Sequence, residues 1–164
     1  MTIFFTADTH FGHRNILTYC NRPFSNIGDM NEAIIQGWNA RVQPYDTVYH
    51  LGDFSFGPNP SSYMDRLNGT KSLIIGNHDK ASTFTMHGWE WYTDYMELRH
   101  PGERHPIVLC HYKFQVWNAK HRGAFHLYGH SHGNLPGCRQ SLDVGVDNVG
   151  FAPITLAEAK ERML

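Results

Sequence analysis

The chain has 164 residues and a formal net charge of −1 at pH 7 with histidine counted as neutral. This balance excludes a general nucleic-acid-binding protein, and no apolar run approaches the roughly 18 residues that cross a bilayer. Hydrophobic residues make up 41% of the chain, enough for one packed core, so we expect a single domain over residues 1–164.

Histidine is the compositional outlier, with 12 copies in the chain. Histidine is the commonest metal ligand in proteins and a frequent acid or base. The three cysteines are scattered, without CxxC spacing, and the first residues, MTIFFTADTH, lack the basic and long apolar regions of a signal peptide. We therefore expect a cytoplasmic protein without a disulfide framework.

The N-terminal half alternates short β-rich runs with helical patterns. One helix is predicted to begin after Asp29, which can cap the segment MNEAIIQGWNARV and has a glutamate three residues later. A second helix is predicted over 59–69, where Asn59 can cap, the following proline can occupy the first turn and Gly69 can end it. The strands predicted in this half are 2–7, 46–51 and 71–76.

The C-terminal half is predicted to contain more strands and one helix. The Pro-Gly pair at 101 and 102 can join two antiparallel strands, and Thr155 with Glu158 forms a capping box before a last helix. This alternation of strands and helices favours a layered α/β fold. The elements predicted here are strands over 90–99, 105–110, 124–129 and 138–145 and a helix over 155–163.

Five of the apolar runs lead directly into aspartate, asparagine or histidine. In α/β sheets, ligands bind beyond the carboxyl ends of the strands, so one sheet would bring these side chains to a common rim. Residues two positions apart in an extended segment project to one side, and the glycines that precede three of these residues permit close backbone approach. The residues are Asp8, His10, Asp53, Asn77, His78, His111, His130 and His132.

Oxygen and imidazole groups without thiolate suit Mn, Fe, Zn or Ni rather than a structural zinc finger. Seven candidate ligands are too many for one ion and suit two ions about 3.5–4 Å apart, as in two-metal hydrolases. Taken singly, each residue fits an ordinary turn, a solvated loop or a satisfied core histidine equally well. The metal hypothesis depends on all five strand ends occurring together.

The series DTH, GD, GNHD, H and GHSH, from residue 8 to residue 132, resembles the calcineurin-like metallophosphoesterase family and keeps the family's order. The forms FFTADTHFGHRNIL and VYHLGDFSFG are most similar to small single-domain phosphoesterases of bacteria and phages. The resemblance implies a four-layer α/β/β/α sandwich with its metal site at the carboxyl ends of the strands. It also implies two divalent ions, Mn²⁺ first, with Fe, Zn or Ni as alternatives.

The same resemblance assigns roles to the candidate residues. One ion would be held by Asp8, His10 and His132. The other would be held by Asn77, His111 and His130. The catalytic pair would be Asp53, which bridges the ions, and His78, which assists the leaving group while a metal-bridging hydroxide attacks.

The segment GDFSFGP replaces the GDxxDRG of the family's protein phosphatases, which argues against a phosphoprotein phosphatase. Two divalent ions, two aspartates and a hydroxide leave a net positive site, which together with the missing arginine favours phosphodiesters. A small-molecule phosphomonoesterase is the alternative. A non-catalytic binding scaffold on the same fold is a minor alternative, because such a protein would be expected to have lost a ligand or His78.

Substrate contacts are less defined by the sequence. His13, Arg14 and Asn15 follow the first motif and fit either a substrate phosphate or the polar start of a helix. The segment 112–125 mixes basic and aromatic residues and fits either a base-stacking surface for a nucleotide-like substrate or, preferably, a loop with packed aromatics. We expect a small phosphate-ester or nucleotide-like substrate, no membrane partner and no general nucleic-acid binding, and the oligomeric state stays open.

Overall fold

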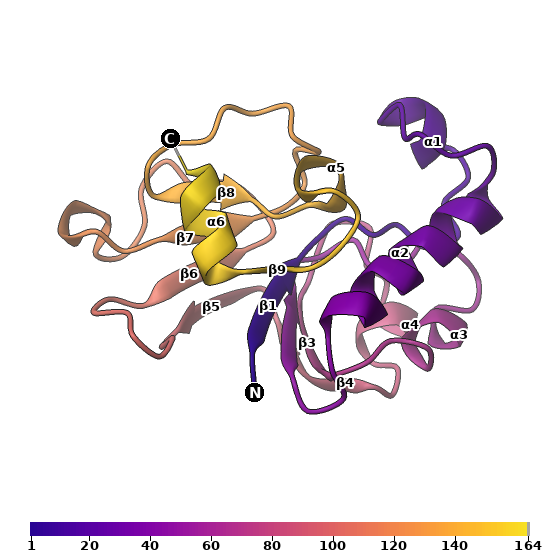
Figure 1. Ribbon diagram of the computed structural model, residues 1–164, viewed down its shortest axis with the longest axis horizontal. Helices are drawn as coiled ribbons and strands as arrows, with labels where there is room; N and C mark the ends of the chain where they lie inside the picture. The colour runs from indigo at the N-terminus through magenta and orange to yellow at the C-terminus, as the bar shows by residue number, and fades with distance from the viewer. Residues whose placement is uncertain (164) are drawn as a thin grey trace.

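Two β-sheets lie face to face at the centre of the computed structural model, which describes residues 1–163 (Figure 1). The first sheet contains β1 (Ile3–Thr6), β2 (Thr47–His50), β3 (Thr70–Ile74), β4 (Trp89–Thr93) and β9 (Ile154–Thr155). Its strand order is β4-β3-β2-β1-β9. The first four strands of the chain run parallel, and β9 pairs antiparallel with β1 at the edge.

The second sheet is smaller and has the order β5-β6-β7-β8. It contains β5 (Tyr95–Leu98), β6 (Ile107–Cys110), β7 (His126–Tyr128) and β8 (Ser141–Asp143). The last three strands run parallel, and β5 pairs antiparallel with β6. Every strand predicted from the sequence overlaps an observed one.

The helices are mostly short, and the longest, α2, covers the outer face of the first sheet (Figure 1). They are α1 (Ile16–Tyr19), α2 (Ile27–Arg41), α3 (Ser61–Met64), α4 (Ala81–Phe84), α5 (Val146–Val149), α6 (Leu156–Arg162) and a 3₁₀ turn, η1 (Lys120–Arg122). The predicted capping box of Thr155 and Glu158 is present at the start of α6. Within residues 1–163, no helix is long and apolar enough to span a membrane.

Successive side chains of β1 face the two main cores in turn, so the strand lies between them. Phe5 faces the core between the sheets, with Leu109 and Leu127 from the second sheet. Phe4 faces the core under α2, with Ile34 and Trp38. This separation follows from the strand period of two, which sends adjacent side chains to opposite faces.

A third, smaller core lies on the outer face of the second sheet, where Trp117 and Ala124 pack against Val108. Segment 112–125, which includes η1, forms this layer. Trp117 is buried and donates a hydrogen bond from Nε1 to the Ala124 carbonyl, so the packed-loop interpretation of this segment is confirmed. The α/β sandwich class is also confirmed, and its fourth layer consists of this loop and one 3₁₀ turn.

Both predicted caps of the N-terminal half were wrong. Helix α2 is capped by Asn26, whose Oδ1 accepts a hydrogen bond from the Asp29 N–H at 2.9 Å, so Asp29 lies in the first turn. Helix α3 is a single turn without a side-chain cap from Asn59. The helix ends at Met64, before the predicted end at Gly69, where the chain turns towards β3. The carbonyls of residues 67 and 69 accept hydrogen bonds from the Lys71 ammonium and not from helical N–H groups.

The predicted hairpin across the Pro-Gly turn is half correct. Strand β5 pairs with β6 as expected, but Trp89–Thr93 pairs with β3 in the first sheet. Trp89 packs in the core under α2 and Trp91 against the core between the sheets. The chain therefore passes from one sheet to the other at Asp94, where the sequence pattern shows no interruption.

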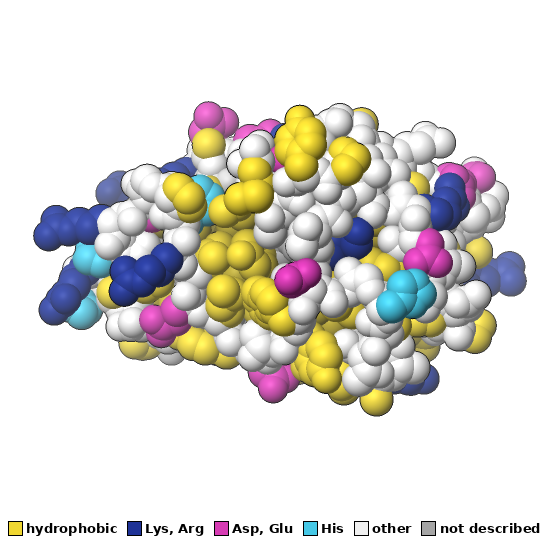
Figure 2. Space-filling view, turned by 90° about the horizontal axis from the view of Figure 1, so that it is seen from below, with side chains coloured by type: hydrophobic (Ala, Val, Ile, Leu, Met, Phe, Trp, Pro, Cys, Tyr) yellow, Lys and Arg dark blue, Asp and Glu magenta, His cyan; other side chains and the backbone are white. Residues whose placement is uncertain are grey.

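The five strand ends singled out in the sequence come from two sheets, not from the single sheet that we assumed. Strands β1, β2 and β3 lie in the first sheet and β6 and β7 in the second. A parallel bridge between Ala7 and Gly145 joins the sheets beyond β1 and β8. The rim therefore lies where the carboxyl ends of both sheets meet, away from the face in Figure 2, whose centre is covered by hydrophobic side chains.

Gly52 keeps these strand ends in contact. Its φ is +96°, and a Cβ added there would lie 2.7 Å from the Gly76 Cα and would collide with Nδ1 of His111. Gly102 also has a positive φ, +85°, but a Cβ there would have nothing within 4 Å. Both glycines therefore have a left-handed backbone conformation, but only at Gly52 would an added Cβ collide with neighbouring atoms.

We predict that Gly52→Ala lowers the free energy of unfolding by about 3 kcal/mol, because left-handed strain and overpacking add. The matched variant Gly102→Ala should lose only about 1 kcal/mol, from strain alone. Urea unfolding of both variants measures the difference. Equal losses would show that the close approach of the strand ends does not contribute.

Candidate metal centre

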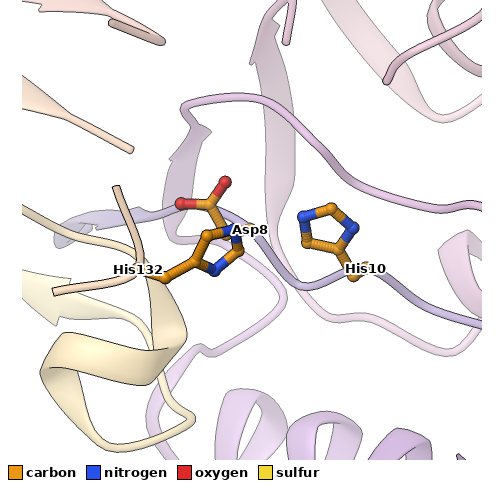
Figure 3. Close-up of side chains that lie close together, drawn as sticks. All are labelled: Asp8, His10 and His132. Atoms are coloured by element: carbon orange, nitrogen blue, oxygen red, sulfur yellow. The ribbon is translucent and has the colours of Figure 1, made fainter. Parts of the chain in front are cut away.

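The loops beyond β1, β2, β6 and β7 bring the predicted ligands together in two clusters. Within each cluster the candidate ligand atoms lie within 4.8 Å of one another. Figure 3 shows the first cluster, in which Asp8 and His10 come from the N-terminal loop and His132 from the C-terminal half of the chain. The second cluster consists of Asp53, His111 and His130. The structure thus brings Asp8, His10 and His132 together, and places His111 and His130 with Asp53. The assignment of these residues to two ions stays a prediction.

Asp53 lies between the clusters. Its Oδ2 is 3.5 Å from Nε2 of His10 and 3.5 Å from Nε2 of His111. Its Oδ1 accepts a hydrogen bond from the backbone N–H of His78 at 2.9 Å. One carboxylate oxygen therefore faces a ligand of each cluster, which is the position that a bridging group needs.

Asn77 is exposed beside the second cluster, and His78 is exposed beside the first cluster. Asn77 Oδ1 lies 3.0 Å from Nε2 of His111, and the ring centroid of His78 lies 5.7 Å from that of His10. Buried Asp79 holds this turn against the loop after β2, because its carboxylate accepts hydrogen bonds from the N–H groups of Gly76, Asp53 and Phe54. The turn therefore presents both side chains to the rim.

The first cluster contains buried polar atoms without hydrogen-bond partners, as expected of a cation site. Asp8 Oδ1 and His10 Nε2 are buried without a hydrogen-bond partner, although buried polar atoms are normally paired. Burial raises the pKa of Asp8 to about 8 and lowers the pKa of His10 to about 2. Among residues 1–163, no lysine or arginine forms an ion pair with the carboxylate of Asp8 or Asp53. The donor set therefore fits a divalent cation, which needs neutral histidine and ionised carboxylate.

Hydrogen bonds orient two of the candidate histidine ligands. His111 donates from Nδ1 to the Leu51 carbonyl at 2.7 Å, and His132 donates from Nδ1 to Asp147 Oδ2 at 2.7 Å. Burial lowers the pKa of His132, but the Asp147 carboxylate outweighs this and raises it to about 10. Each ring thus turns Nε2 towards its cluster, an arrangement common around metal-bound histidines.

Sequence reasoning missed Arg22 and Asp147. Arg22 is buried, and its guanidinium donates two hydrogen bonds to Asp147, at 2.8 and 2.7 Å. It also donates to the backbone carbonyls of Asp8, at 2.7 Å, and Thr9, at 3.1 Å. One side chain therefore holds the loop of the first motif and the partner of His132. No local signal marked either residue, because they lie 125 positions apart and outside the motifs.

The backbone around the ligands is not extended, so our reason for the two-residue spacing was wrong. Among residues 1–163, eight non-glycine residues have a positive φ, and five of them are predicted ligands: Asp8, His10, Asp53, His130 and His132. Strained left-handed residues gather at functional sites, where the surrounding structure maintains them. The predicted role of the glycines holds, since a Cβ on Gly129 would lie 2.7 Å from Asp8 Oδ2.

A cavity of about 430 Å³ opens beside the first cluster. His10, His78 and His132 line it, together with two of the three predicted substrate contacts, His13 and Asn15. Arg14 is exposed and does not line this cavity. Asn15 immediately precedes α1 without a side-chain cap. Binding of substrate by these three residues stays a prediction.

Two other buried histidines lie outside the clusters. The Nε2 of His50 lies 3.0 Å from Thr9 Oγ1, and burial lowers the pKa of His50 to about 3. His126 is buried inside the second sheet. Its ring bridges the Phe114 N–H and the Val108 carbonyl, so it is a satisfied core histidine.

Comparison with known proteins agrees with this geometry. Residues 1–146 match the calcineurin-like phosphoesterase family. The chain is 32% identical to uncharacterized protein MJ1445 of Methanocaldococcus jannaschii, over 94% of this chain and 86% of the relative. The crystal structure of the protein of unknown function AQ665 from Aquifex aeolicus has a TM-score of 0.78 and 26% identity over 97% of both chains.

YfcE, a phosphoesterase from E. coli, shares the fold with a TM-score of 0.50 and 18% identity, over 95% of this chain and 82% of that chain. The family match spans every motif from Asp8 to His132. The chain belongs to the calcineurin-like phosphoesterase family, which implies metal-dependent hydrolysis of phosphoesters.

Proposed function

We propose that the protein hydrolyses small phosphodiesters at a centre of two divalent ions, with Mn²⁺ as the first choice. The observation that carries the proposal is the position of Asp53, whose Oδ2 lies 3.5 Å from Nε2 of His10 and of His111. These histidines belong to separate clusters, each large enough for one ion. A shared carboxylate oxygen is what a two-metal site requires.

The ligands of each ion follow from the clusters. Asp8, His10 and His132 would hold the first ion, and His111 and His130, with Asn77 beside them, the second. Bound divalent ions polarise a phosphoryl oxygen and lower the pKa of bound water towards neutrality. Burial excludes water from the Asp8, Asp53 and His111 side chains, which strengthens their interaction with a cation.

In this proposal, His78 has the role of acting on the leaving group. It is exposed, lines the cavity beside the first cluster, and is fixed by the hydrogen bond from its backbone N–H to Asp53. A histidine at this position can donate a proton to the departing oxygen of an ester held at the clusters. The side chain thus supplies acid catalysis without serving as a ligand.

The diester preference is supported by the charges around the site. The cavity is lined by histidine, asparagine, apolar residues and cysteine, and its described lining includes no lysine or arginine. Arg14, which could have offset a second negative charge, lies outside that lining. A phosphodiester carries one negative charge and needs less compensation than a phosphomonoester, which remains the alternative substrate.

The first test compares bis-p-nitrophenyl phosphate with p-nitrophenyl phosphate after chelator treatment and reloading with Mn²⁺. We expect turnover only with metal, a higher rate for the diester, and a loss of about 100-fold or more in Asp53→Asn. His87→Ala is the control, since this exposed histidine pairs with Asp65 away from the clusters. Metal-independent turnover, or a wild-type rate in Asp53→Asn, contradicts the hydrolase proposal, and a faster monoester reverses the substrate preference.

The role of His78 has a separate test, based on the leaving group. p-Nitrophenolate departs without protonation, whereas an alkoxide needs a proton. We predict that His78→Ala loses about 100-fold more activity on a diester with an alkoxide leaving group than on bis-p-nitrophenyl phosphate. Equal losses on both substrates would assign His78 to binding or folding instead of acid catalysis.

Asp147 is predicted to position His132 for the first ion. Removing such a hydrogen-bonded partner weakens metal binding by roughly 10- to 100-fold. In a calorimetric Mn²⁺ titration, Asp147→Ala should therefore weaken one of two binding steps, and Asp147→Asn, which keeps an acceptor for His132, should weaken it less. Asp65→Ala removes an exposed carboxylate as the control. Equal weakening of both steps, or of neither, would refute this assignment.

A further inference from the structure

Two large aromatic side chains are exposed in the cavity beside the first cluster. Tyr19 is 72% exposed and Phe56 is 44% exposed, and both line the cavity next to the first cluster. Tyr112, beside His111 and His130, is also exposed, at 46%, but does not line this cavity, whereas Phe11 and Phe54 are buried. Exposed aromatic rings that share one concave site with polar groups are a common feature of ligand pockets.

The lining of the cavity combines two kinds of side chain. Three are histidines of the site, and Ile16, Tyr19 and Phe56 form an apolar, aromatic wall beside them. Asn15 and Asn134 add amide groups to the lining that can form hydrogen bonds. The described lining residues include no lysine, arginine, aspartate or glutamate. The Lys80 ammonium lies 5.7 Å from the Phe56 ring centroid but is not among these lining residues. The lining itself therefore favours a neutral group.

The aromatic wall is already ordered. The ring of His13 stacks on Phe56 with centroids 4.3 Å apart and planes inclined by 17°. Tyr19 meets the same His13 ring edge to face, at 6.1 Å and 75°. This interaction engages Tyr19 on one side only, and the remainder of its ring is open to the cavity and solvent. A planar group can stack there without rearrangement of the wall.

We propose that this cavity is a subsite for a neutral, planar ring carried by the phosphoester substrate, with a nucleobase as its chemical type. The inference rests on the proposed function for the phosphate position and adds the class of substituent. The cavity volume of about 430 Å³ lies in the lower part of the range of about 300–1,000 Å³ for small-ligand sites, which suits one ring system. Stacking on Tyr19 supplies affinity, and the two asparagine amides supply hydrogen bonds.

A matched pair of substrates tests the subsite. Adenosine 2′,3′-cyclic phosphate and ethylene phosphate contain the same five-membered cyclic phosphodiester, with and without a base. We expect the Mn²⁺-loaded wild-type protein to prefer the adenosine ester by about tenfold or more in kcat/KM, the effect of one base–aromatic stack. Tyr19→Ala should reduce the ratio of the two kcat/KM values towards one. Tyr19→Phe keeps the ring and should preserve the ratio.

Tyr45→Ala is the control, because Tyr45 is also exposed, at 68%, and precedes the amino end of β2. A wild-type ratio near one, or a ratio that Tyr19→Ala leaves unchanged, overturns the subsite. Binding of adenosine itself, followed by saturation-transfer NMR, does not require turnover. If neither cyclic ester is hydrolysed but adenosine binds wild type and not Tyr19→Ala, the subsite stands and the hydrolase proposal falls. If adenosine does not bind and the esters are cleaved equally, the hydrolase proposal stands and the subsite falls.

Discussion

Two buried carboxylates that pair with no lysine or arginine of residues 1–163 determine the organisation of this protein. Asp8 and Asp53 are almost completely removed from solvent, and their nearest charged or polar partners are histidines and backbone N–H groups. Isolated buried carboxylates are costly, as the raised pKa of Asp8 shows. A bound divalent ion would offset this cost, and neutral His10 is the protonation state that such an ion needs. The rim of the sandwich is therefore built around charge that is left for a cation to offset.

Three further carboxylates maintain the loops that carry the ligands. Asp79 and Asp143 accept hydrogen bonds from backbone N–H groups on two loops each, and Asp147 receives Arg22 and His132. These bonds hold turns in which the ligands adopt left-handed backbone conformations, each of which costs about 1–3 kcal/mol. The strain persists because the anchoring acceptors are buried and rigid. Ligand geometry thus depends on side chains that never contact the proposed ions.

The sequence predicted the composition of the site better than the geometry that produces it. Polar residues at strand ends are a local pattern, so Asp8, Asp53, His111 and the other ligands could be recognised without knowledge of the fold. The division of the strands between two sheets could not be predicted. The sequence pattern of residues 90–99 is that of one continuous strand, although the chain changes sheet at Asp94.

Interactions between distant segments were equally hidden from the sequence. Arg22 meets Asp147 only in the folded chain, and the left-handed turns around the ligands have no signature beyond their neighbouring glycines. Segment 112–125 differs, since a loop with packed aromatics was the preferred interpretation and Trp117 does cover the second sheet. Tyr19 and Phe56 contribute little to any core, so their exposure beside the ligands requires an explanation other than folding. The aromatic surface available to a substrate therefore consists of the rings that do not pack into a core.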